Sequence, residues 1–134
     1  MKCFITICSK KKDNSPLLLP AHLRYLAPHV EQTYEKAKEL NIPFYILSGK
    51  YGLVSGDENI PYYDYYLEVD KVDELSDIVG EQIKKLGITD INFYFEEKET
   101  WKPYIVALEK ATDKTECVLN KELLFPNTPE LKMR

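Results

Sequence analysis

Residues 46–66 read ILSGKYGLVSGDENIPYYDYY, an apolar run that breaks into a glycine-containing segment rich in Lys, Tyr and Asp. We expect a buried strand over residues 44–48, because residues 44–47 read FYIL. Gly49 and Gly52 then permit backbone conformations that other residues avoid. Since α/β proteins place binding sites in loops at strand ends, we expect this loop to hold a ligand.

A second strand end near the amino terminus shows the same pattern. Residues 2–8 read KCFITIC, a short apolar run typical of a buried central strand. Residues 8–12 read CSKKK, so small polar side chains and then cations follow the run. Because the carboxyl ends of parallel strands share one edge of a sheet, two such ends side by side would form a crevice.

The rest of the chain alternates between helical and strand patterns. We expect helices over residues 20–26, 28–40, 71–86 and 102–112, and further strands over residues 91–95 and 116–119. Pro28 suits the first turn of the second helix, and Gly87 suits the C-terminal cap of the third. Residues 49–69 are expected to be a long loop, which in a compact domain points to function.

Strands separated by helices predict a parallel sheet with right-handed crossovers. We therefore predict an α/β protein: a three-layer, Rossmann-like single domain over residues 1–125, with a mostly parallel sheet of four or five strands. Two prolines past Phe125 predict an irregular tail over residues 126–134. A length of 134 residues fits one such domain.

Cysteine usage and hydropathy bound the setting of the protein. The three cysteines are an odd number without a CxxC spacing, and only two histidines are present, so neither a disulfide framework nor a zinc site is indicated. No apolar run approaches the roughly 20 residues of a membrane span, and the amino terminus lacks the apolar segment of a secretory signal. We expect a soluble protein of the reducing cytoplasm, with no membrane partner.

The net charge of −4 argues against broad binding to duplex DNA, which requires a basic face. The charge is unevenly spread along the chain. Residues 1–67 carry eight Lys and Arg against seven Asp and Glu, whereas residues 68–134 carry ten against fifteen. The amino-terminal half, which contains both strand ends, is therefore the half that would meet an anion.

Cys8 and the lysines after it are candidates for chemistry at the first strand end. Nearby cations favour a thiolate, so Cys8 could be a nucleophile, although a buried structural cysteine is the commoner fate of this residue type. Of the three lysines at 10–12 we expect one to bind a phosphate, with Lys10 and Lys12 as candidates. We interpret His22 and His29 as structural, since a lone histidine on a helix is more often structural than catalytic.

Asp64 is the best candidate for a general base or nucleophile, because tyrosines flank it on both sides. Apolar rings raise the pKa of a carboxyl group, and phenol hydroxyls can orient it. The alternative is that Asp64 only caps a turn.

Residues 48–52 and Arg24 are candidates for holding a ligand. The segment reads SGKYG, which has neither the P-loop spacing nor the dinucleotide fingerprint. It would therefore bind through Lys50, Tyr51 and the flexible backbone around its glycines. Arg24 could face an anion or simply solvent.

Four segments carry a resemblance to a known family: residues 7–12 (ICSKKK), 24–25 (RY), 45–53 (YILSGKYGL) and 60–67 (IPYYDYYL). From the first to the last they span residues 7–67, about half of the chain. In this order they resemble small domains related to the bacterial peroxide-stress protein YaaA, and the Cys-Ser pair is similar to a motif of archaeosine synthase, a tRNA base-modifying enzyme. The resemblance implies a connection to nucleobases or nucleic acids. Relatives commonly have Gly-x-x-Tyr after the third strand, where this chain has the charged run 96–99, so we expect no ligand contact there.

Two functional hypotheses follow. The first is an enzyme that acts on a nucleobase, nucleoside or nucleotide, through base modification or N-glycosidic chemistry, with Asp64 and Cys8 as the reacting groups. The second is a module that binds a nucleotide or a flipped base without turning it over, in stress or phage-related biology. Both leave nucleic acid and the oligomeric state open, and neither requires a metal or a cofactor. The expected ligand-binding residues are Ser9, Lys10, Lys12, Arg24, Ser48, Gly49, Lys50, Tyr51, Gly52 and Tyr63.

Overall fold

The computed structural model describes residues 1–124, which form a five-stranded sheet with the strand order β4-β3-β1-β6-β7. Four of these strands are parallel and β4 runs antiparallel to β3 at one edge. A separate antiparallel pair joins β2 to β5. The strands are β1 (Lys2–Ile7), β2 (Leu19–Pro20), β3 (Phe44–Ser48), β4 (Gly52–Ser55), β5 (Asn59–Ile60), β6 (Asp90–Phe95) and β7 (Val118–Leu123).

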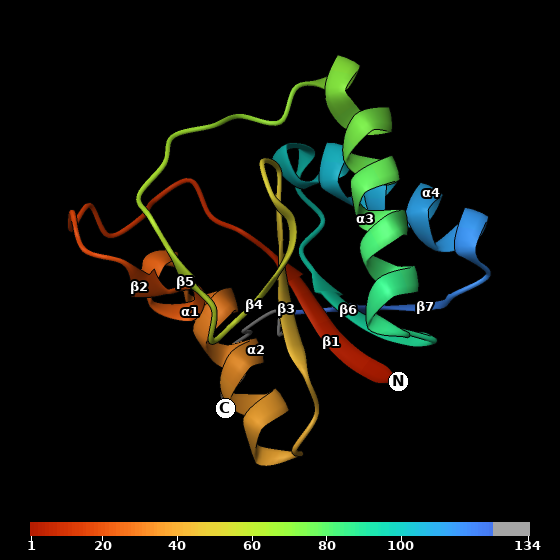
Figure 1. The fold of residues 1–134 in the computed structure, drawn as a ribbon, viewed down its shortest axis with the longest axis horizontal. Coiled ribbons are helices and arrows are strands. Elements are labelled where there is room, and N and C mark those ends of the chain that lie inside the picture. The colour runs from red at the N-terminus through yellow and green to blue at the C-terminus, as the bar shows by residue number, and fades with distance from the viewer. Residues whose placement is uncertain (125–134) are drawn as a thin grey trace, which may run out of the picture.

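Helices connect the parallel strands. Figure 1 shows α2 on one side of the sheet and the packed pair of α3 and α4 on the other. The α/β class and the mostly parallel sheet are thus confirmed, whereas the predicted tail over residues 126–134 lies outside the described residues. The helices are α1 (Ala21–Arg24), α2 (Pro28–Glu39), α3 (Val72–Leu86) and α4 (Lys102–Thr115), with single 3-10 turns η1 (Val69–Lys71) and η2 (Glu99–Trp101).

The core lies along the central strands. Ile5 of β1, Ile46 of β3 and Ile91 of β6 are fully buried, because each strand has neighbours on both edges and helices over its faces. This is why the sequences of β1 and β3 are nearly continuously apolar, whereas β6 begins with alternating polar residues, the half-buried Asp90 and Asn92. Within residues 1–124, no helix is both long enough and apolar enough to cross a membrane.

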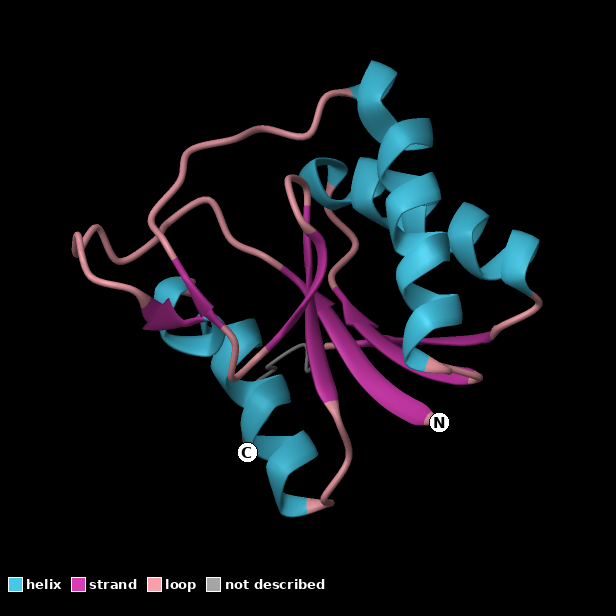
Figure 2. Cartoon of the chain, in the orientation of Figure 1, coloured by secondary structure: helices cyan, strands magenta, loops and turns pink. Residues whose placement is uncertain are grey.

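The prediction of an unstructured loop over residues 49–69 is wrong in part. Gly52 adopts a φ of +75°, which lets the chain reverse after β3 and return as β4. Gln82 of α3 then bonds the edge: its side-chain oxygen accepts the Leu53 N–H at 2.7 Å, and its amide nitrogen donates to the carbonyls of Tyr51 and Leu53, each at 3.2 Å. From Pro61 to Glu68 the chain has no regular structure, as Figure 2 shows.

The hairpin predicts a specific cost for a side chain at Gly52. A Cβ there would meet the Gln82 side-chain oxygen and would lie 2.9 Å from Ile78 Cγ2, on a backbone that already disfavours it. Gly87 is a matched control, because its φ is +69° and nothing lies within 4 Å. We expect Gly87→Ala to cost about 1–2 kcal/mol of unfolding free energy in urea. Gly52→Ala should cost about 1–3 kcal/mol more through overpacking; equal costs would contradict this account of the turn.

Candidate functional site

A cavity of about 520 Å³ lies at the carboxyl ends of β1 and β6. The chain leaves β1 toward β3 on one side of the sheet and leaves β6 toward β7 on the other, so these two neighbouring strands diverge where they end. Such a point is where α/β sheets hold ligands. The lining comes from residues 7–10 and Lys12 after β1, from Thr100, Trp101, Pro103 and Tyr104 after β6, from residues 64–67, and from His29 of α2.

His29, interpreted from the sequence as structural, lines this cavity. Its Nε2 lies 2.8 Å from the carbonyl oxygen of Ile7, so Nε2 carries the proton and donates it. The imidazole ring packs against Trp101, with the ring centroids 4.9 Å apart. Burial lowers the pKa of His29, partly offset by the hydrogen bond to Ile7. The cavity therefore contains a neutral imidazole at neutral pH.

Cys8 lies in the cavity as a protonated thiol, not as the thiolate that the nucleophile hypothesis requires. Its Sγ is 3.8 Å from the hydroxyl oxygen of Tyr104. Burial raises the pKa of Cys8, and this outweighs the backbone N–H of Gly49, the Tyr104 hydroxyl and the charge of Lys12, all of which lower it. The sequence-based argument counted the cations after Cys8 but could not include the loss of solvent.

Asp64 lines the cavity but has neither of its two predicted environments. The carboxylate is exposed rather than enclosed by the neighbouring rings, and it accepts no hydrogen bond from any described residue. Of its tyrosine neighbours, Tyr63 is buried and turned inward, whereas Tyr62 and Tyr66 are exposed. Asp64 is therefore neither a desolvated base nor a turn cap, but a solvated charge at the mouth of the cavity.

None of the lysines around the cavity forms an ion pair with a carboxylate of residues 1–124. Within residues 1–124, seven lysines form ion pairs, and all seven lie between residues 71 and 121. Lys10, Lys12 and Lys50 form none; their ammonium groups rest on tyrosine rings instead. Lys10 Nζ lies 5.5 Å from the centroid of Tyr66, and Lys12 Nζ lies 4.7 Å from that of Tyr63. These cations keep their charge available for an anion.

Ser48 and Tyr63, both expected to bind a ligand, form a buried hydroxyl chain beside the cavity instead. Ser48 Oγ accepts the backbone N–H groups of Lys50 and Tyr51, each at 3.1 Å, which uses both lone pairs. Its own proton must then be donated to the Tyr63 hydroxyl at 2.9 Å, and Tyr63 in turn donates to Tyr25. Burial raises the pKa of both Tyr25 and Tyr63. This chain of hydroxyl groups is uncharged, and it fixes the turn on which Lys50 lies.

Residues 49–52 of the β3–β4 turn, predicted to hold a ligand, do not line the cavity. A Cβ on Gly49 would lie 3.2 Å from both Leu67 Cβ and the Tyr104 hydroxyl, so this glycine allows close packing beside the cavity. Lys50 and Tyr51 lie on the turn and do not line the cavity. Gly52 packs against α3 and is not available to a ligand. Ser9 does line the cavity, and its hydroxyl donates to the Lys11 carbonyl at 2.7 Å.

Arg24 does not face an anion, which corrects the sequence-based expectation. The residue is fully buried, and its guanidinium donates to four backbone carbonyls at 2.5–3.2 Å, those of Asp13, Ser15, Leu17 and Ile60. The first three carbonyls belong to the loop after β1, and the fourth ends β5, just before the tyrosine-rich segment. Arg24 therefore holds together the two segments that carry Lys12 and Tyr63.

Sequence reasoning missed the whole wall that follows β6. Thr100, Trp101, Pro103 and Tyr104 line the cavity although the charged run before them led us to expect no ligand contact. The residues of the run do not line the cavity: Glu96 pairs with Lys98 at 2.8 Å, and Glu97 is exposed. The available signal was topological, because the end of β6 lies beside the end of β1 in any sheet with this order.

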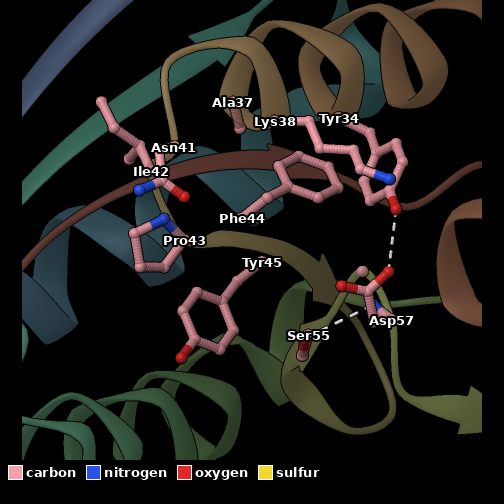
Figure 3. Close-up of a pocket in the computed structure, with 11 residues that line it drawn as sticks. Tyr34, Ala37, Lys38, Asn41, Ile42, Pro43, Phe44, Tyr45, Ser55 and Asp57 are labelled. Carbon is pink, nitrogen blue, oxygen red and sulfur yellow. Dashed lines mark hydrogen bonds between the residues drawn. The ribbon is translucent and has the colours of Figure 1, made fainter.

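A second hollow, of about 310 Å³, lies at the opposite end of β3 and contains none of the predicted site residues. Figure 3 shows Asp57 of this hollow hydrogen-bonded to Tyr34 and to Ser55. The Tyr34 hydroxyl donates to Asp57 at 2.8 Å, and Lys38 Nζ lies 5.5 Å from the Tyr34 ring centroid. Lys38 is the one cation among the residues that line this hollow, whereas both Lys10 and Lys12 line the cavity at the carboxyl ends.

Comparisons with family models, with curated proteins and with solved structures find no match to this chain. The functional assignment therefore depends on the chemistry of the cavity and of its rim.

Arg24→Met should strongly destabilise the fold, because it leaves several carbonyls without their donor. Each unsatisfied buried polar group costs about 1–3 kcal/mol, so we expect a loss of about 3 kcal/mol or more in urea unfolding. Lys114→Met is the control, since its ion pair with Asp77 is exposed and worth about 0–1 kcal/mol. A loss below about 1 kcal/mol for Arg24→Met would show that water replaces the guanidinium.

His29 should make folding stability depend on pH. Because its folded pKa lies below that of the unfolded chain, the unfolded state binds more protons as the pH falls below about 6.5, and stability declines. We expect His29→Asn to flatten the dependence of unfolding free energy between pH 7 and pH 5. The pKa of His22 is also lowered by burial, so His22→Asn is measured beside it. An unchanged slope in His29→Asn would contradict the neutral, cavity-facing imidazole.

Proposed function

We propose that this protein binds a nucleotide, with the base in the cavity at the ends of β1 and β6 and a phosphate near Lys12. The observation that carries the proposal is the combination of aromatic walls with unpaired ammonium groups at one cavity. Trp101, Tyr104 and Tyr65 offer ring surface for a planar base, and Lys10 and Lys12 offer charge for an anion. A volume of about 520 Å³ falls within the range of small-molecule pockets, about 300–1,000 Å³.

The neutral groups in the cavity suit recognition of the base. A nucleobase presents both donors and acceptors at its edges. Thr100 has a hydroxyl group that can donate or accept, and Ser9 Oγ, whose proton is donated to the Lys11 carbonyl, can accept. The charged carboxylate of Asp64 also accepts. Polar groups of this kind fix the orientation of a ligand whose rings are held by apolar contacts.

A nucleotide-acting enzyme is the second candidate, favoured by the presence of Cys8 and Asp64 in the same cavity. A protonated thiol and a solvated carboxylate are weak groups for nucleophilic or general-base work unless a ligand changes their surroundings. Binding without turnover is therefore the better supported proposal. Mass spectrometry of a nucleoside and nucleotide panel after incubation separates the two, because a binding protein returns every ligand unchanged.

Three broader features belong to the same proposal. Helices on both sides of the sheet and the divergence of the chain at β1 and β6 support a three-layer, Rossmann-like arrangement. The relationship to the YaaA-related domains rests on the motifs at the ends of β1 and β3. Free thiols at Cys3, Cys8 and Cys117 support a reducing, cytoplasmic setting.

Titration calorimetry of Lys12→Ala tests the nucleotide proposal. Loss of one ammonium contact to a phosphate should lower the affinity for a nucleoside monophosphate about tenfold or more, and should leave nucleoside binding nearly unchanged. Lys11→Ala is the matched control, because Lys11 is exposed next to Lys12 and does not line the cavity. Absence of binding by every nucleotide tested, or equal losses in the two variants, would refute the proposal.

A further inference from the structure

A second unpaired lysine lies just outside the cavity and is linked to Lys12 by one tyrosine ring. Lys12 Nζ is 4.7 Å from the centroid of Tyr63, and Lys50 Nζ is 5.6 Å from the same centroid. Lys12 lines the cavity, whereas Lys50 does not. One ammonium group therefore lies at the cavity and the other lies outside its lining, and both contact the Tyr63 ring.

The structure holds this pair of cations in place. The Tyr63 hydroxyl is hydrogen-bonded to Ser48 and to Tyr25, so the side chain cannot move to another position without breaking these buried hydrogen bonds. The backbone N–H of Lys50 is bonded to Ser48 Oγ, which fixes the turn on which Lys50 lies. Lys50 Nζ also lies 5.4 Å from the Tyr51 ring centroid. The uncharged tyrosine rings attract the ammonium groups and leave their positive charge intact.

Lys10, which also lines the cavity, has a different electrostatic setting. Hydrogen bonding and charge interaction with Tyr66, and more weakly the charge of Asp64, raise the pKa of Lys10. Asp64 is the one carboxylate among the residues that line the cavity, and its charge stabilises the ammonium group of Lys10. Neither Lys12 nor Lys50 has a carboxylate partner within residues 1–124. The uncompensated positive charge lies on the side of Tyr63.

We propose that the ligand is a nucleoside polyphosphate whose phosphate chain leaves the cavity past Lys12 and ends at Lys50. This inference rests on the proposed nucleotide binding and specifies its ligand. A monophosphate seated in the cavity reaches Lys12 alone, whereas a chain of phosphates places charge beside both lysines. Ammonium groups act as point charges toward phosphate oxygens, so each added contact strengthens binding.

The experiment is titration calorimetry of a nucleoside monophosphate, the matching triphosphate and inorganic tripolyphosphate, in EDTA so that no metal masks the phosphates. With the wild-type protein we expect the triphosphate to bind about tenfold or more tightly than the monophosphate. Lys50→Ala should reduce this ratio to near one while leaving the monophosphate affinity unchanged. Lys38→Ala is the control, because Lys38 also rests on a tyrosine ring, at the second hollow.

The outcomes separate this inference from the proposal on which it rests. Equal affinities for monophosphate and triphosphate would overturn the polyphosphate assignment and leave nucleotide binding intact. An equal loss of both affinities in Lys50→Ala would overturn it too, because Lys50 would then act on the turn rather than on the outer phosphates. Binding of tripolyphosphate, with no binding of either nucleotide, would refute the nucleotide proposal and with it this inference.

Discussion

The buried guanidinium of Arg24 is the interaction on which the candidate site depends. It gathers four carbonyl oxygens from two segments, including that of Ile60, 36 residues away in the sequence. No carboxylate accompanies it, so the charge is satisfied by peptide dipoles alone, and its Nε has no partner among residues 1–124. A buried charge held in this way is costly to disturb. The loop with Lys12 and the segment with Tyr63 therefore keep a fixed relation, although Lys12 forms no more than an isolated bridge with Tyr25 and residues 61–68 have no regular structure.

Lysine side chains have different partners in two regions of the molecule. On α3, α4 and β7 the lysines pair with carboxylates at the surface, as in the contacts of Lys110 with Asp73 and of Lys121 with Glu109. At the carboxyl ends of β1 and β3 the lysines rest on tyrosine rings. A ring face attracts a cation but leaves its charge intact. The many tyrosines of this chain thus maintain a positively charged rim on a protein whose net charge is negative.

Desolvation explains why the cavity suits binding better than bond-making chemistry. Burial holds the Cys8 thiol and the Tyr104 hydroxyl protonated and the His29 imidazole neutral. All three are then donors or acceptors without charge. The carboxylate of Asp64 is ionisable but lies in solvent, where nothing activates it. The exposed charged groups Lys10 and Asp64 therefore lie in solvent, whereas Cys8, Tyr104 and His29 are half-buried and uncharged.

The sequence by itself determined the α/β class, the parallel strands at residues 2–7 and 44–48, and the concentration of candidate residues where those strands end. These follow from local apolar patterns and from the signals of Pro28 and Gly87, which act within a few residues. Only the tertiary structure decided the roles of Arg24, His29 and Trp101. Cys8 meets Tyr104 across 96 residues of sequence, and its pKa depends on solvent removed by those distant neighbours. Burial and long-range packing are sums over many segments, so no local pattern encodes them.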